Sequence, residues 1–173
     1  MAPKSFSMYL LSLIVAINIV AIMATHTHYD PNKVYTIRPL HDKTVALHTR
    51  DSSQVQLQIY SHGKAYSLFH IQHSRENGLS FYLVSEPTGE VMDFNRRTKS
   101  VIMSSRNGSL RQLWYLTHDN RIVNADTHLA LTLRYRHVEN GHLKYGTPLI
   151  VSQNNGSINQ EFKIWEDLPS STY

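Results

Sequence analysis

The sequence predicts an all-β domain built from three similar segments, and two observations support this. The first is an internal repeat in which a glycine, five residues, an aromatic residue, one residue and then isoleucine or leucine follow one another three times. The second is the alternation of apolar and polar residues over short stretches, typical of strands with one buried face. No window of eleven or more residues after residue 24 has a helical apolar stripe, so helix is expected to be minor.

The repeated motif predicts a shared core. Its members are Gly63, Phe69 and Ile71, then Gly108, Trp114 and Leu116, then Gly156, Phe162 and Ile164. The aromatic residues are 45 and 48 positions apart, room for about four short strands per repeat. The glycine fits a tight turn that needs positive φ. The aromatic and aliphatic residues lie two apart, so they share one strand face. One unit cannot bury this face alone, and three units closing a common core predict a β-trefoil.

Strands and turns follow one another along the chain as this fold requires. Strict alternation marks 55–59, 129–133 and 162–164 as strands with one buried face. Turn-forming residues lie between such stretches, at 86–89, 106–108, 139–141 and 154–156.

The N-terminus predicts a secretory signal peptide over residues 1–24. Lys4 supplies a basic start, 8–23 is almost entirely apolar, and Ala24 precedes a polar segment. The alternative is an uncleaved membrane anchor. Cleavage is favoured because the apolar run is shorter than the ~20 residues that cross a bilayer and contains Asn18. The protein is therefore expected to be secreted and, once cleaved, to have no membrane contact.

The rest of the chain is predicted to form one domain. A polar N-terminal segment covers 25–33, the trefoil covers 34–167, and a tail covers 168–173. The three repeats are expected at about 34–78, 79–119 and 120–167.

Composition narrows the partners and the chemistry. The chain carries a formal net charge of +4, and loss of Lys4 with the signal peptide leaves +3. The basic residues are scattered, apart from small groups at 96–99 and 134–136, which argues against a nucleic-acid partner. The absence of cysteine excludes a thiol nucleophile and structural cysteine–zinc sites, so the core must stabilise the fold.

Over about residues 34–166 the chain resembles the ricin-B type (QxW) lectin family. The segment 146–162 resembles the family's third strand, turn and fourth strand, and it ends in Asn159-Gln160-x-Phe162. The second repeat contains Gln112-Leu-Trp114, the full QxW, whereas the first has Ser67-Leu-Phe69. The resemblance implies a β-trefoil that binds carbohydrate.

The resemblance also implies where a sugar would bind. In this family an aspartate on the second strand accepts bonds from sugar hydroxyls, an aromatic residue near the end of the third strand stacks on the ring, and an asparagine precedes the QxW glutamine. The second repeat keeps Asp93, but the stacking position falls at Ser104, and Arg111 replaces the asparagine. We predict a pocket there with Asp93 and Asn95 as acceptors and Gln112 as support. The alternative for Asp93 is an ordinary surface carboxylate beside a turn.

The other two repeats depart further from the pattern. The third has Thr132 at the aspartate position and Ser152 at the stacking position, although Asn159 and Gln160 remain as candidate sugar contacts. The first has His48 at the aspartate position, Ile59 or Tyr60 near the stacking position, and Ser67 in place of the glutamine.

The predicted function is a secreted, non-catalytic lectin-like module that recognises terminal sugars of glycoconjugates. Its partners would be glycans or glycoproteins, with self-association supplying avidity. The alternative is a degenerate trefoil that contacts another extracellular protein at a wall, coat or host-contact surface. A third class, a trefoil of the growth-factor or cytokine kind that binds sulfated polysaccharide or a receptor, is disfavoured by the low charge, the lack of a basic cluster and the QxW-like motifs.

Other motifs give weaker predictions. No G-x-S-x-G or H-E-x-x-H is present, and nothing places Asp93 and Asp126 at a catalytic separation, so no enzyme activity is expected. The eleven histidines lack metal-ligand spacing, and only His26 and His28 could hold a metal loosely, so neither metal nor cofactor is expected. Asn107 and Asn155 begin N-x-S sequons at predicted turn tips, where either could carry a glycan.

Overall fold

The computed structural model describes residues 28–49, 54–75 and 79–168. Over these ranges the regular elements are fourteen strands and three short 3-10 helices, which confirms the all-β prediction. None of the helices in this part of the chain could cross a membrane. The predicted signal peptide lies outside the described residues.

Six strands pair side by side in antiparallel fashion, in the order β14–β1–β4–β5–β8–β9. A hydrogen bond of 2.8 Å from the N–H of Phe162 to the carbonyl of Asn120 connects β14 to the segment before β9, so the six strands form a closed ring. The six strands are β1 Tyr35–Pro39, β4 Phe69–His73, β5 Phe81–Ser85, β8 Trp114–Leu116, β9 Ile122–Asn124 and β14 Phe162–Glu166.

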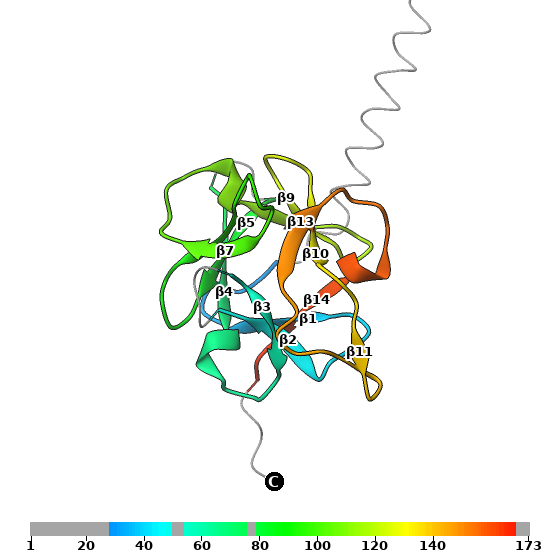
Figure 1. Cartoon of the computed structure of the whole chain (residues 1–173). Helices are drawn as coiled ribbons and strands as arrows, with labels where there is room; N and C mark the ends of the chain where they lie inside the picture. The colour runs from blue at the N-terminus through cyan, green and yellow to red at the C-terminus, as the bar shows by residue number, and fades with distance from the viewer. Residues whose placement is uncertain (1–27, 50–53, 76–78, 169–173) are drawn as a thin grey trace, which may run out of the picture.

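Three hairpins accompany this ring (Figure 1). They are β2 Val45–His48 with β3 Gln56–Ile59, β6 Val91–Phe94 with β7 Val101–Ser104, and β10 Ala130–Leu133 with β13 Leu149–Ser152. Main-chain hydrogen bonds of 2.8–3.0 Å join each hairpin to the next, from Val55 to Val101, from Val151 to Lys99 and from Leu149 to Val55. The hairpins are therefore hydrogen-bonded to one another around the molecule.

A fourth, smaller hairpin lies between β10 and β13. It consists of β11 Val138–Glu139 and β12 His142–Leu143, around the turn predicted at 139–141, and it projects at the edge of the molecule (Figure 1). The buried carboxylate of Asp42 anchors it by accepting the N–H of Leu143 at 2.6 Å. The sequence predicted the turn but not a separate hairpin.

The three aromatic residues of the repeated motif lie in the core, as predicted. Phe69, Trp114 and Phe162 are all 0% exposed and belong to one apolar cluster. Burial of each such side chain stabilises the fold by about 1.5–3 kcal/mol. The indole N–H of Trp114 donates to the carbonyl of Met92 at 2.9 Å, so its polar atom is also satisfied.

The turn glycines also behave as predicted. Gly63, Gly108 and Gly156 have φ of 70°, 75° and 76°, a region that costs other residues strain.

One strand prediction is wrong in part. The alternation over 55–59 predicted that Ile59 is buried, yet its side chain is 60% exposed, whereas Val55 and Leu57 are fully buried. Ile59 pairs with Val45 at the open end of the β2–β3 hairpin, where it lines a cleft against the β11–β12 hairpin. A residue outside the predicted domain also joins the core. Tyr29 is 6% exposed, and its ring packs edge-on against Tyr35 and Phe81.

Candidate carbohydrate site

The QxW glutamine of the second repeat lies at the end of a 3-10 helix. This helix, η2 Leu110–Gln112, precedes β8 and places the amide of Gln112 beneath the β6–β7 hairpin with no exposure to solvent. Its Oε1 accepts the N–H of Asn107 at 2.9 Å, and its Nε2 donates to the carbonyl of Ser105 at 3.0 Å. Gln112 therefore holds the loop after β7, and its support of a sugar pocket stays a prediction.

Asp93, on β6, meets this amide. Its Oδ2 accepts from Nε2 of Gln112 and from the hydroxyl of Ser104, each at 3.3 Å, and its Oδ1 accepts the N–H of Phe94 at 2.7 Å. The guanidinium Nε of Arg111 lies 3.7 Å from Oδ1. Asp93 is only 3% exposed, so the alternative that it is a surface carboxylate is wrong. These four contacts offset the cost of burying the charge.

The geometry limits what Asp93 can offer a ligand. A carboxylate has about four lone-pair sites, and four protein groups already face them. A sugar hydroxyl would therefore have to displace the long contact to Arg111. Ser104 and Arg111 are both partly exposed and would meet a ligand first. Ser104 also occupies the position where the family has a stacking aromatic residue, so this pocket has hydrogen-bonding groups but no ring at that position.

Asn95 does not belong to this pocket. Its Oδ1 accepts the N–H groups of Arg97 and Thr98 at 2.9 and 3.0 Å, and the residue is exposed. It stabilises the turn between β6 and β7. The structure thus brings Asp93 and Gln112 together and places Asn95 in the turn.

The third repeat contains the same arrangement without the charge. Gln160, at the end of η3 Ile158–Gln160, is 0% exposed and accepts the N–H of Asn155 at 3.1 Å. Its Nε2 donates to the carbonyl of Gln153 at 2.7 Å, and to the hydroxyls of Ser152 and Thr132 at 3.1 and 3.2 Å. Thr132 therefore lies where Asp93 lies in the second repeat. Oδ1 of the neighbouring Asn159 is buried without a hydrogen-bond partner and remains a candidate acceptor for a ligand.

The first repeat lacks the amide altogether. Ser67 ends the 3-10 helix η1 Ala65–Ser67, and its hydroxyl is buried without a hydrogen-bond partner. His48 is buried at the aspartate position, with its ring centroid 5.7 Å from that of Tyr66. The hydroxyl of Tyr60, a stacking candidate, is bound to Asp167 at 2.6 Å. Burial and this hydrogen bond raise the pKa of Tyr60.

The two predicted sequons lie at exposed turns. Oδ1 of Asn107 accepts the N–H of Ser109 at 2.9 Å, and Oδ1 of Asn155 accepts that of Ser157 at 3.1 Å. Both asparagines are exposed, so the turns present them to solvent. No cluster of three histidine or carboxylate side chains suited to a metal occurs in the described ranges.

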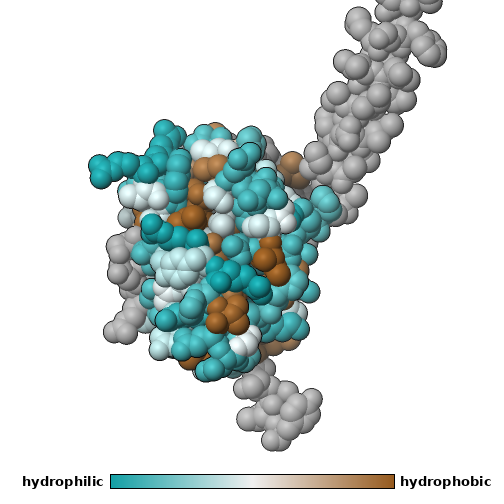
Figure 2. Space-filling view, turned by 45° about the vertical axis from the view of Figure 1, so that its right-hand side comes forward, coloured by the Kyte–Doolittle hydropathy of each residue, from teal (hydrophilic) through white to brown (hydrophobic). Residues whose placement is uncertain are grey.

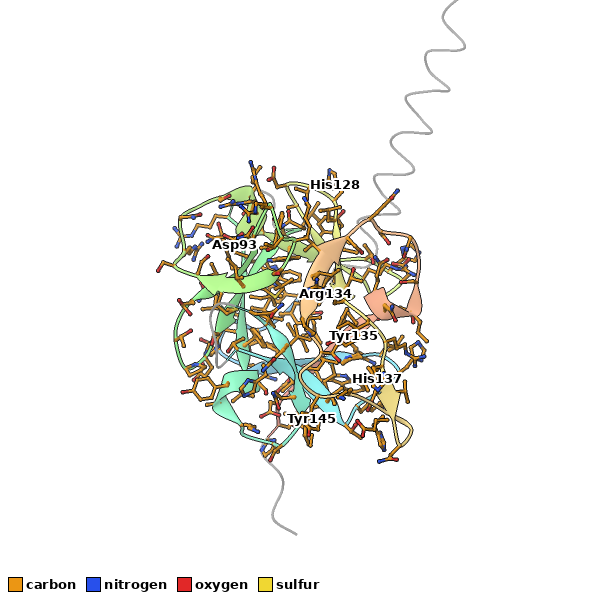
Figure 3. All side chains as sticks on the ribbon, in the orientation of Figure 1. Asp93, His128, Arg134, Tyr135, His137 and Tyr145 are labelled. Atoms are coloured by element: carbon orange, nitrogen blue, oxygen red, sulfur yellow. The ribbon has the colours of Figure 1, made fainter. Side chains whose placement is uncertain are left out.

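Sequence reasoning missed a cleft of about 400 Å³ beside the β11–β12 hairpin. Ile59, Asn140, His142 and Tyr145 are among the residues that line it. Tyr135, His137 and Tyr145 lie on this side of the molecule, well away from Asp93 (Figure 3). Nothing in the alternation over 55–59 indicated that Ile59 would face such a cleft.

Comparison with solved structures identifies the fold. A designed threefold-symmetric protein, ThreeFoil, matches with a TM-score of 0.63 and 21% identity over 76% of this chain and 97% of its own. The C-terminal half of an earthworm R-type lectin in complex with GalNAc matches with a TM-score of 0.61 and 12% identity, over 78% of this chain and 98% of its own. An endo-β-galactosidase from Clostridium perfringens matches with a TM-score of 0.63 and 12% identity over 78% of this chain, which spans only 32% of that enzyme.

These likenesses establish a β-trefoil, the fold of the lectin structures among the matches. No protein-family model matches the chain, and no curated protein matches it in sequence.

Proposed function

We propose that the chain is a secreted, non-catalytic carbohydrate-binding module of the ricin-B lectin type that recognises terminal sugars of glycoconjugates. In this proposal the three repeats are β1–β4, β5–β8, and β9, β10, β13 and β14, with β11–β12 as an insertion in the third. The observation that carries the proposal is the buried pair of Asp93 and Gln112 beside the partly exposed Ser104. The carboxylate of Asp93 lies where the resemblance places a sugar acceptor, and the partly exposed Ser104 beside it would meet a ligand first.

The likeness to trefoil lectins supports a carbohydrate ligand. The matches include an earthworm lectin with GalNAc and a Vibrio vulnificus trefoil lectin with N-acetyl-D-lactosamine. This chain covers only 32% of the matched enzyme. Both points favour binding over catalysis.

A second function, contact with another extracellular protein, is favoured by a different observation. Ser104 and Ser152 occupy the stacking positions of two repeats, so neither has an aromatic ring there for a sugar. Exposed apolar residues also occur, and the face in Figure 2 shows them as separate patches among hydrophilic residues. Patches of this kind suit a modest protein contact or self-association.

A glycan array probed with the secreted protein tests the proposal. Asp93→Ala removes the acceptor, Asp93→Asn keeps its shape, and Thr132→Ala is the matched control in the third repeat. We expect binding to a coherent set of terminal sugars that both Asp93 variants lose and the control keeps. Binding that survives in a folded Asp93→Ala protein would exclude this pocket and direct attention to Asn159 and Gln160. A blank array of both neutral and anionic glycans from folded wild-type protein would refute carbohydrate binding and favour the protein-contact function.

A further inference from the structure

Basic side chains from three separate segments line one cavity of about 740 Å³. His28 precedes the first strand, His73 and Arg75 lie at and after the end of β4, and Arg106 lies in the loop after β7. Pro31 and Gln72 complete the described lining, which contains no carboxylate. Within the described chain, no ion pair joins Arg75 or Arg106 to an acidic residue. Among the described residues, no acidic side chain compensates the charges of Arg75 and Arg106.

The guanidinium of Arg106 is held in place by two neighbouring strands. It lies over the ring of Tyr82, 3.8 Å from the centroid, and its Nη1 donates to Oε1 of Gln72 at 3.1 Å. Gln72 on β4 and Tyr82 on β5 are partners in the strand register, so both contacts come from one rigid pair of strands. A guanidinium has five N–H donors, so most of them remain for a ligand.

The histidines form a flat wall of the same cavity. The rings of His28 and His73 are stacked, with centroids 5.3 Å apart and planes 4° from parallel. Nε2 of His73 accepts the N–H of Tyr29 at 3.3 Å, which fixes this ring relative to the core residue Tyr29. The two arginines thus supply the charge, and the imidazoles supply a preformed surface beside it.

We propose that this cavity binds an oxyanion carried by a glycan, either a sulfate ester or a uronic-acid carboxylate. Arginine forks match the paired oxygens of such groups and bind them more strongly than neutral acceptors. The cavity volume falls in the range of about 300–1,000 Å³ typical of small-molecule sites, so there is room for a sugar ring as well as its anion. The proposal rests on the carbohydrate-binding function but uses a different set of residues from the Asp93 pocket.

The experiment measures binding of three probes to the secreted protein by titration calorimetry. They are a sulfated heparin oligosaccharide, an unsulfated hyaluronan oligosaccharide and inorganic sulfate. Arg75→Ala combined with Arg106→Ala removes the two guanidiniums of the cavity. Arg134→Ala combined with Arg136→Ala removes the same charge from an exposed segment and is the matched control. Arg106→Lys keeps the charge but removes the fork, and Arg75→Ala alone, at an exposed position, guards against loss of folding.

We expect at least one of the two oligosaccharides to bind, with affinity that falls as salt rises, and the cavity variant to weaken this binding at least about tenfold. Both oligosaccharides contain uronic acid and only heparin is sulfated, so binding of hyaluronan as well as heparin would identify the carboxylate, and binding of heparin alone would identify the sulfate ester. The control should change affinity less than about twofold, because distant exposed charges are screened.

Three results would overturn the proposal. Equal weakening by both double variants would indicate general charge attraction. Inorganic sulfate that binds as tightly as the oligosaccharides would indicate a simple anion site. Neutral sugars that bind while neither charged oligosaccharide does would refute this cavity and leave the carbohydrate function intact. Conversely, a blank array of neutral sugars with retained binding of an anionic oligosaccharide would refute the Asp93 pocket alone.

Discussion

Gln112 and Gln160 make nearly the same contacts in two repeats, so replacing each by leucine gives an internally controlled prediction. Gln112→Leu leaves the N–H of Asn107 and the carbonyl of Ser105 without their partner, and it removes a donor from the carboxylate of Asp93. Hydrogen bonds to charged groups contribute about 1.5–3 kcal/mol, and neutral ones about 0.5–1.5 kcal/mol. Asn107 and Ser105 are exposed, so water can replace part of what they lose. We therefore expect Gln112→Leu to lower the free energy of unfolding by about 2–4 kcal/mol.

Gln160→Leu should cost less. Its amide donates to the hydroxyl of Thr132, a neutral group that also bonds to the carbonyl of Ala130 at 2.8 Å and to Ser152 at 2.8 Å. Leucine at position 160 therefore removes no hydrogen bond from a buried charged group. The expected loss is about 1–3 kcal/mol, about 1 kcal/mol smaller than at Gln112.

Urea unfolding followed by tryptophan fluorescence measures both values, provided that the slope of each transition is unchanged. A double-mutant cycle with Asp93→Asn tests the cause, because the difference between the two leucine variants should disappear when Asp93 is neutral. An equal cost at the two sites, or a larger cost at Gln160, would contradict the argument. So would a difference that persists in the Asp93→Asn background.

Three further predictions concern other contacts. Arg111→Asn introduces the residue that the lectin family resembled by this chain has at this position and frees an oxygen of Asp93, so sugar affinity on the array should rise, whereas Arg134→Asn should leave it unchanged. Burial alone would raise the pKa of Asp42, but hydrogen bonds from neighbouring hydroxyl and N–H groups outweigh it and lower the pKa below 3.8. The stability that Asp42 contributes is therefore complete above the unfolded-state pKa and is lost as the pH falls below it. Asp42→Asn should destabilise the protein by about 1–3 kcal/mol at neutral pH and flatten the acid limb of its stability profile, measured by urea unfolding from about pH 2.5 to 7. Trp114→Phe removes the buried indole N–H and should lower the free energy of unfolding by about 1–3 kcal/mol. An unchanged midpoint of urea unfolding would contradict this prediction.

The parts of the fold predicted from sequence are those that depend on local chemistry. Gly108 lies in a turn that requires positive φ, and Trp114 lies six residues later on a buried strand face. Such relations repeat along the chain and are visible without knowing which segments meet. The turn at 139–141 is also local, but the β11–β12 hairpin depends on Asp42, far away in the chain, so it could not be predicted.

The candidate site was only partly accessible to the same reasoning. The pairing of Asp93 with Gln112 followed from the family resemblance, whereas the burial of Asp93 did not. Its alternative as a surface carboxylate failed because β6 turns the side chain toward the buried amide. Asn95, two residues further on, lies in the turn and bonds only to that turn's main chain.

The sequence by itself determined that three glycine–aromatic motifs would close a common β core, because turn conformation and strand periodicity are properties of neighbouring residues. Only the tertiary structure decided where the charges gather. Arg75 and Arg106 look like isolated basic residues in the sequence, yet the β4–β5 pair and the loop after β7 bring them to one cavity. Such a cluster arises from packing between segments distant along the chain, and a charge count along the sequence does not contain it.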